Sequence, residues 1–188
     1  MRQITVLLSV VFFLSSCTSL VNSVVKEPIN PDPTSSSIGS DINDFKMDTY
    51  IGVNIKKAAP ALKKSHVNVH VYSGVVLLTG EVPTQDLKVL AGNTARAYHG
   101  ARQVHNELSV RGNSSIVSRT NDTIITAQVK TKLTFDKEIE SSDIEVTTED
   151  SVVYLMGKVR RLSGEKATAV ASGTSGVRKV VKVFEYVD

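Results

Sequence analysis

Apolar residues recur at helical spacing near the start of two separate segments of the chain. These positions are Ile51, Ile55, Ala59 and Leu62 in one segment and Ile125, Val129 and Leu133 in the other. A spacing of three or four residues predicts an amphipathic helix in each segment. Asp48 and Asp122 are expected to lie at the N-cap or in the first turn of these helices, and Pro60 is expected to end or kink the first of them.

Each predicted helix is followed by patterns that are typical of strands. Val67, Val69 and Val71 alternate with polar residues, and Ser73 and Gly74 follow them as a predicted hairpin turn. The runs 75–78 and 152–155 are almost continuously apolar, which indicates a buried central strand in each segment.

A second helix and a last strand complete each segment. Thr84 and Ser163 are placed to cap the second helices, and Gly100 and Gly176 are placed to end them. The last strands are predicted at 104–110 and 177–187. The order αββαβ therefore occurs twice and predicts an α+β fold with two tandem domains, 46–112 and 119–188, each a three-stranded mixed sheet covered by two helices on one face.

The two segments are also copies of each other in sequence. Residues 67–82 align without a gap with residues 144–159, and further matching blocks lie before and after them in the same order. Four glycines occupy equivalent places in the two copies and are predicted to have structural roles: Gly80 and Gly157, and Gly100 and Gly176.

Residues 1–16 are typical of an export signal. The apolar run 4–14 is too short to span a bilayer, which needs roughly 20 apolar residues. Residues 14–17, Leu-Ser-Ser-Cys, resemble the lipobox of bacterial lipoproteins, which implies lipidation of Cys17; an ordinary signal peptide is the alternative. Thr18, rather than aspartate, implies sorting to the outer membrane. Residues 17–45, with several serines and prolines, predict a flexible tether behind the acylated cysteine.

Composition argues against several classes of function. The 188 residues include 22 Lys and Arg against 19 Asp and Glu, and this small net charge of +3 argues against a nucleic-acid partner. Aromatic residues make up only 5% of the chain, so few side chains are available to stack on bases or sugars, which argues against a site that recognises its ligand by stacking. The single cysteine excludes an internal disulfide and a zinc site of several thiolates. No catalytic motif occurs, so neither an enzyme nor a cofactor is expected.

Histidines are the remaining candidates for metal chemistry. His66 and His70 share one face of the predicted strand around 67–71, which makes a surface metal pair an alternative. No third ligand is near them in sequence, so both are expected to be solvated and no metal site is predicted.

The repeated motif resembles a known family. Val76-x-Leu78-x-Gly80-x-Val82, followed by a helix and a second glycine–valine motif, resembles the BON domain of bacterial envelope proteins. Two such domains behind a lipobox resemble a family of outer-membrane lipoproteins that localise to the division site, related to osmotically induced periplasmic proteins. This resemblance implies a lipid-anchored protein that faces the periplasm, binds an anionic phospholipid membrane and supports envelope integrity. A periplasmic adaptor or chaperone-like module with envelope protein partners is the alternative.

In that family, the first helix of the second domain is associated with anionic phospholipid. If the apolar positions of this helix named above face the core, Ile124 and Phe135 face outward, with Lys130 and Lys132 alongside. Exposed apolar residues beside lysines suit shallow insertion into a membrane interface. These four are the predicted phospholipid-binding residues, and packing of Ile124 against the first domain is the alternative.

The first domain also carries positive charge. Residues 46–112 hold nine basic and four acidic residues, including Lys56, Lys57, Lys63 and Lys64 around the first helix. These lysines serve either solubility or attraction to an anionic bilayer. The sequence therefore leaves open which domain contacts the membrane, and it also leaves open the oligomeric state.

Overall fold

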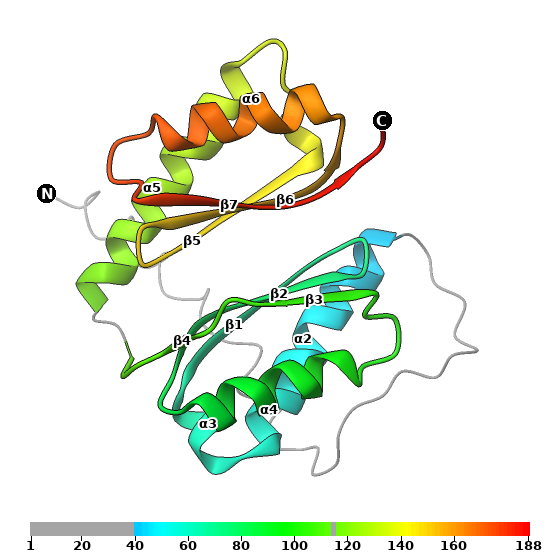
Figure 1. Ribbon diagram of the computed structural model, residues 1–188, viewed down its shortest axis with the longest axis vertical. Coiled ribbons are helices and arrows are strands. Elements are labelled where there is room, and N and C mark those ends of the chain that lie inside the picture. The colour runs from blue at the N-terminus through cyan, green and yellow to red at the C-terminus, as the bar shows by residue number, and fades with distance from the viewer. Residues whose placement is uncertain (1–39, 114–115) are drawn as a thin grey trace, which may run out of the picture.

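The computed structural model describes residues 40–113 and 116–188, which form two units of one design (Figure 1). The first unit contains α2 (Ser40–Ala58), α3 (Pro60–Lys64), β1 (His66–Tyr72), β2 (Val75–Val82), α4 (Gln85–Arg96), β3 (Gln103–Asn106) and β4 (Ser109–Val110). The second unit contains α5 (Ile116–Phe135), the 3-10 helix η1 (Ser141–Asp143), β5 (Ile144–Glu149), β6 (Val152–Val159), α6 (Arg161–Ser172) and β7 (Lys179–Tyr186). The predicted signal peptide, Cys17 and residues 18–39 lie outside the described residues, whereas residues 40–45, assigned to the tether, begin α2.

Each unit contains the predicted mixed sheet. β1 runs antiparallel to β2, which runs parallel to β3 and β4, and the β5–β6–β7 sheet has the same pattern. The expected continuous strand at 104–110 is instead divided into β3 and β4. Between them Leu108, only 1% exposed, enters the core, and its N–H donates to the Asn106 side chain. Such a local side-chain contact competes with strand pairing.

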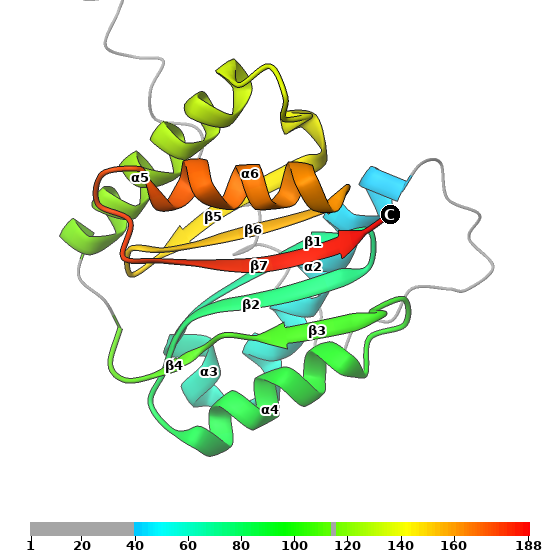
Figure 2. The ribbon, with the colours of Figure 1, turned by 45° about the horizontal axis from the view of Figure 1, so that its top comes forward.

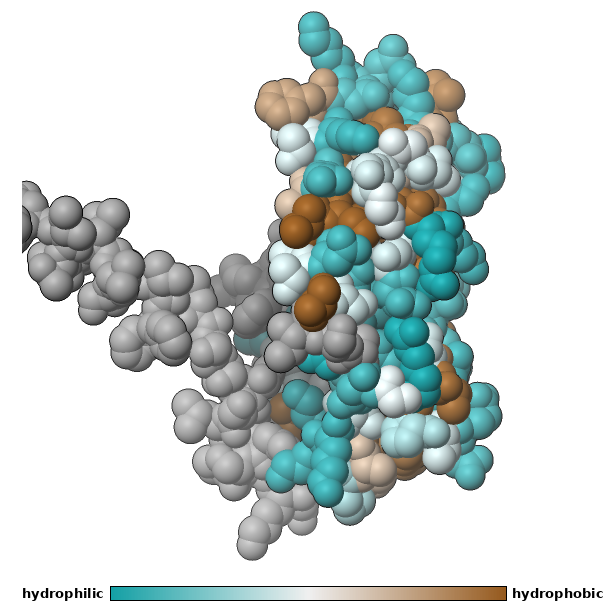
Figure 3. Space-filling model, turned by 90° about the vertical axis from the view of Figure 1, so that its left-hand side faces the viewer, coloured by the Kyte–Doolittle hydropathy of each residue, from teal (hydrophilic) through white to brown (hydrophobic). Residues whose placement is uncertain are grey.

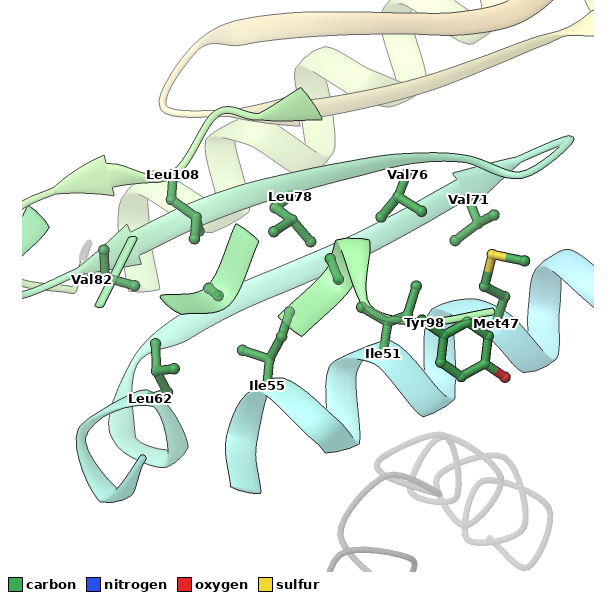
Figure 4. Close-up of a cluster of buried hydrophobic side chains, with 12 residues drawn as sticks. Met47, Ile51, Ile55, Leu62, Val71, Val76, Leu78, Val82, Tyr98 and Leu108 are labelled. Atoms are coloured by element: carbon green, nitrogen blue, oxygen red, sulfur yellow. The ribbon is translucent and has the colours of Figure 1, made fainter. Parts of the chain in front are cut away.

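The core of each unit lies between its sheet and its helices. Ile51 and Ile55 of α2 point toward Val76 and Leu78 of β2 (Figure 4). β2 is buried along its whole length, as predicted for the central strand. The corresponding core of the second unit includes Ile125, Val129 and Leu133 of α5.

The helix starts predicted at Asp48 and Asp122 are wrong, because α2 and α5 begin eight and six residues before them. Asp122 instead accepts hydrogen bonds from two backbone N–H groups of the β5–β6 turn, at 2.9 and 2.8 Å. Asp44, four residues before Asp48, does the same for the β1–β2 turn. A carboxylate from each first helix therefore holds the hairpin turn of its own sheet.

Pro60 separates α2 from α3, as predicted, and Thr84 caps α4 by accepting a hydrogen bond from the N–H of Leu87 at 3.3 Å. Ser163 does not cap α6, since this helix begins two residues earlier.

The four equivalent glycines all have positive φ: 108° at Gly80, 96° at Gly100, 157° at Gly157 and 85° at Gly176. Gly100 and Gly176 lie three residues beyond the helix C-caps, so neither is the terminating residue of its helix that the sequence predicts.

The two sheets face each other, and the helices lie on the outer sides (Figures 1 and 2). The centre of this interface is apolar and comprises Val75 and Leu77 from the first unit and Tyr154, Met156 and Val183 from the second. Ion pairs cross its border, at 2.8 Å between Arg102 and Glu185 and at 3.2 Å between Arg111 and Asp150. The molecule is thus built in four layers, helices–sheet–sheet–helices.

Candidate functional site

Helix α5 carries a line of exposed apolar side chains. Val117 is 79% exposed, Ile124 51% and Phe135 81%. They are spaced by seven and eleven residues, which are close to two and three turns of about 3.6 residues each, so all three lie along one side of the helix. We call these three residues the α5 stripe.

The orientation of the stripe follows from what the other side of α5 contacts. The core residues Ile125, Val129 and Leu133 are at most 2% exposed. Asp122 holds the β5–β6 turn, and the Thr126 hydroxyl donates to Thr148 of β5 at 2.7 Å. These contacts prevent rotation of the helix about its axis, so the stripe stays directed away from the sheet.

The two predicted lysines are placed differently around the helix. Both are exposed, but Lys132 lies three residues before Phe135 and therefore about 60° from it, whereas Lys130 is about 120° from Ile124. The ammonium group of Lys132 also lies 3.4 Å from the carbonyl oxygen of Gly173 at the end of α6. The structure thus brings Ile124, Phe135 and Lys132 together and leaves Lys130 farther from the stripe.

Ile124 is not buried in the contact between the units, because that contact is formed by the sheet faces and half of the Ile124 side chain is accessible. Figure 3 views the molecule from the side on which α5 lies in Figure 1 and shows separate apolar side chains among polar ones. A shallow groove lies at the end of α5, lined by Phe135 and Lys132 together with Val170 of α6. An exposed ring, an aliphatic wall and an ammonium group can together contact a ligand that is apolar at one end and anionic at the other.

Val117 lies outside the predicted site because Asp122 before an apolar run predicts a later helix start than the structure has. The signal that could have revealed it is the apolar pair at 116–117, which extends the helical spacing backward by two turns.

The first unit offers a weaker candidate surface. Lys63 and Lys64 are exposed on α3, but Lys56 and Lys57 are half-buried. Among the described side chains of this unit, the large exposed apolar residues are Val89 and Leu90 on α4 and Val110 of β4. Helix α4 also carries the cations Lys88 and Arg96, but it has an acidic residue in its first turn and two exposed apolar residues, whereas α5 presents three exposed apolar residues in line.

His66 and His70 are not the solvated side chains that the sequence predicts. Both are half-buried at the border between the units, where His66 lies 3.5 Å from Glu149 and His70 lies 3.5 Å from Glu145. The sequence could not show this, because both carboxylates come from the second unit.

The large pKa shifts among the described residues belong to tyrosines in apolar surroundings. Burial raises the pKa of Tyr98 to about 12, and the neighbouring Tyr50 adds to this. Burial also raises the pKa of Tyr154 to about 12, and nearby carboxylates, Glu107 of the first unit foremost, reinforce it. Each tyrosine belongs to an apolar cluster, so these pKa shifts result from burial in the packed interior.

Of the helices in 40–113 and 116–188, none has the length and apolar character needed to cross a membrane.

Comparison with known proteins gives consistent results. The BON domain family matches residues 48–112 and 121–188. The chain is 33% identical over 190 residues to the outer membrane lipoprotein DolP of Haemophilus influenzae, covering 100% of this chain and 97% of that protein. It is 31% identical over 160 residues to a 21 kDa hemolysin of Actinobacillus pleuropneumoniae, covering 85% of this chain and 80% of that protein.

Proposed function

This chain belongs to the family of outer membrane lipoproteins with two BON domains, and from this premise we propose that acyl chains on Cys17 anchor it in the outer membrane and that the α5 stripe binds anionic phospholipid. The proposal places both units on the periplasmic side of that membrane. It includes a non-enzymatic role in envelope integrity and enrichment at the division site.

The observation that carries the proposal is the exposure of Ile124 and Phe135 on a helix that also presents Lys132. An aliphatic or aromatic side chain gains about 1.5–3 kcal/mol when it is fully buried, and a lysine near an anionic surface gains about 1 kcal/mol. Because insertion at an interface is partial, the sum corresponds to weak binding. An acyl anchor compensates for this weakness, because it keeps the helix at a high local concentration near the bilayer.

The test is cosedimentation of residues 40–188 with vesicles of phosphatidylglycerol or of phosphatidylcholine. We expect binding to the anionic vesicles, and we expect the double variant Ile124→Asp, Phe135→Asp to lose at least about 90% of it, because two carboxylates are repelled by the surface and cannot enter it. Lys132→Glu should weaken binding more than Lys130→Glu, since Lys132 is nearer to the stripe.

Val89→Asp is the matched control, because Val89 is an exposed apolar residue of helix α4 with an exposure of 49% against 51% for Ile124. This variant should bind as the parent does. Undiminished binding of the α5 double variant would contradict the site, and equal binding to both vesicle types would contradict the preference for anionic lipid. Failure to bind vesicles, together with capture of a defined envelope protein, would favour the adaptor alternative.

A further inference from the structure

Three potential metal ligands meet where the two units touch. His66 of β1 and Glu81 of β2 are opposite each other in the antiparallel pair, so their side chains share a face of the sheet. Glu149, the last residue of β5, approaches them from the second unit. One ligand atom from each residue lies within 4.8 Å of the other two, and the His66 Nε2 to Glu149 Oε2 distance is 3.5 Å.

Glu81 is the most unusual member of this cluster. Its side chain is completely buried. One carboxylate oxygen, Oε1, accepts a hydrogen bond from Arg111 at 3.0 Å, whereas the buried Oε2 has no hydrogen-bond partner among the described residues. A buried carboxylate oxygen without a partner is unfavourable, so Oε2 is available to a ligand that can satisfy it.

The lone pairs of the other two residues converge. The Asn68 amide nitrogen lies 3.2 Å from His66 Nε2 and 3.0 Å from Glu149 Oε2, so both atoms are acceptors directed at one point in the tautomer whose Nε2 carries no proton. A cation that displaced this amide would contact both. Donors bonded to zinc at roughly 2.0–2.2 Å in tetrahedral geometry lie about 3.3–3.6 Å from one another, which matches the His66–Glu149 separation.

We propose that His66, Glu81 and Glu149 bind a divalent transition-metal ion of the zinc type, with water as a fourth ligand. Two carboxylates balance the charge of the ion, and the imidazole favours zinc over calcium or magnesium, which prefer oxygen donors. Arg111 remains bonded to the other oxygen of Glu81 and orients this ligand. A surface hollow lined by His66, Asn68 and Glu149, with Thr147 beside them, gives the ion a route to the site.

The consequence of this site is a link between the units, since two ligands come from the first and one from the second. An ion bound only by the assembled pair stabilises that pair. The inference is independent of lipid binding, because none of its ligands lies on α5.

The experiment is zinc chloride titration of the full chain carrying Cys17→Ser, purified in detergent without a polyhistidine tag and freed of metal by a chelator. We expect one zinc ion per chain by calorimetry and a rise in Tm of about 5 °C or more at a hundredfold excess over Kd. Glu81→Gln, Glu149→Gln and His66→Ala should each weaken affinity at least about tenfold, since even loss of an outer partner of a ligand costs about that much.

His70→Ala is the matched control, because His70 forms the neighbouring His–Glu pair at the same 3.5 Å but without a buried third carboxylate. It should retain zinc affinity within about twofold of the parent. Absence of binding to the folded parent, or equal weakening by His70→Ala and His66→Ala, would overturn the proposal. Circular dichroism checks folding, and if Glu81→Gln does not fold, Glu149→Gln and His66→Ala decide the outcome.

Discussion

At the scale of single residues, Gly80 and Gly157 show why the repeated glycine motif exists. Each lies in a central strand with positive φ, at 108° and 157°. A Cβ atom on Gly80 would overlap the carbonyl oxygen of His66 on the paired strand, and one on Gly157 would overlap that of Asp143. The absence of a side chain therefore lets the first and central strands of each unit approach closely.

We predict that Gly80→Ala lowers the free energy of unfolding by at least about 2 kcal/mol, since an unfavourable φ and an overpacked contact each cost about 1–3 kcal/mol. Gly112→Ala is the control, because a Cβ there meets nothing within 4 Å. Its effect should stay within about 0.5 kcal/mol. Urea denaturation of both variants measures the difference, and similar stabilities would contradict this account of the motif.

Individual residues of the candidate surface were predictable only in part. The outward direction of Ile124 and Phe135 follows from the spacing of the core residues, and the structure has both exposed. The different placement of Lys130 and Lys132 around the helix follows from their spacing, whereas the contact of Lys132 with Gly173 depends on the packing of α6 beside the end of α5, which the spacing of one helix cannot show. The buried state of Glu81 depends on the opposing sheet of the second unit.

At the scale of elements, the order of helices and strands was predictable because apolar periodicity is strong in both copies. The starts of the first helices were not predictable. An aspartate before an apolar run has the same sequence signature whether it caps its own helix or accepts hydrogen bonds from a hairpin turn elsewhere in the fold. Asp122 does the latter, through the N–H groups of Asp150 and Ser151. The division of the last strand in the first unit likewise depends on a local contact of Asn106.

The two second helices give a direct test of capping. Thr84→Ala should destabilise the protein by about 1 kcal/mol, because α4 loses the side-chain acceptor at its start. Ser163→Ala, at the third residue of α6, should be neutral or stabilising, because the buried hydroxyl of Ser163 has no hydrogen-bond partner among the described residues. Thermal denaturation compares the two, and a larger loss for Ser163→Ala would refute this assignment of caps.

At the scale of the whole molecule, the face-to-face packing of the sheets was not predicted. The strand faces that form it carry His66, Asn68 and His70 beside an apolar centre, a mixture that is typical of a solvated surface. Only the assembled pair shows that these polar residues have partners, such as Glu149 for Asn68 at 3.0 Å. The duplication thus indicates two domains without indicating how they meet.

Two buried tyrosines, one of them in this interface, predict that the stability of the protein decreases at alkaline pH. The pKa of Tyr154 in the interface and that of Tyr98 in the first core are both raised to about 12 from 10.0. Because the unfolded chain ionises first, stability is complete below about pH 10 and decreases as pH rises through 12. The loss is at most about 2.7 kcal/mol for each tyrosine, since one pKa unit corresponds to about 1.4 kcal/mol.

Urea denaturation at pH 9, 10, 11 and 12 checks this dependence, which is expected to decrease by about half in Tyr154→Phe and further in the double variant with Tyr98→Phe. The parent serves as the reference at each pH, so that titration of other groups cancels. An unchanged slope in the double variant would show that other groups cause the dependence.

The four-layer arrangement turns the helical sides of the two units in opposite directions (Figure 2). A flat bilayer can lie against only one of them at a time. If α5 binds lipid as proposed, α4 with the exposed Val89 and Leu90 is turned toward the aqueous compartment, where soluble macromolecules can reach it. The proposed contact of α5 with lipid would thus leave a second side of the same chain accessible from water.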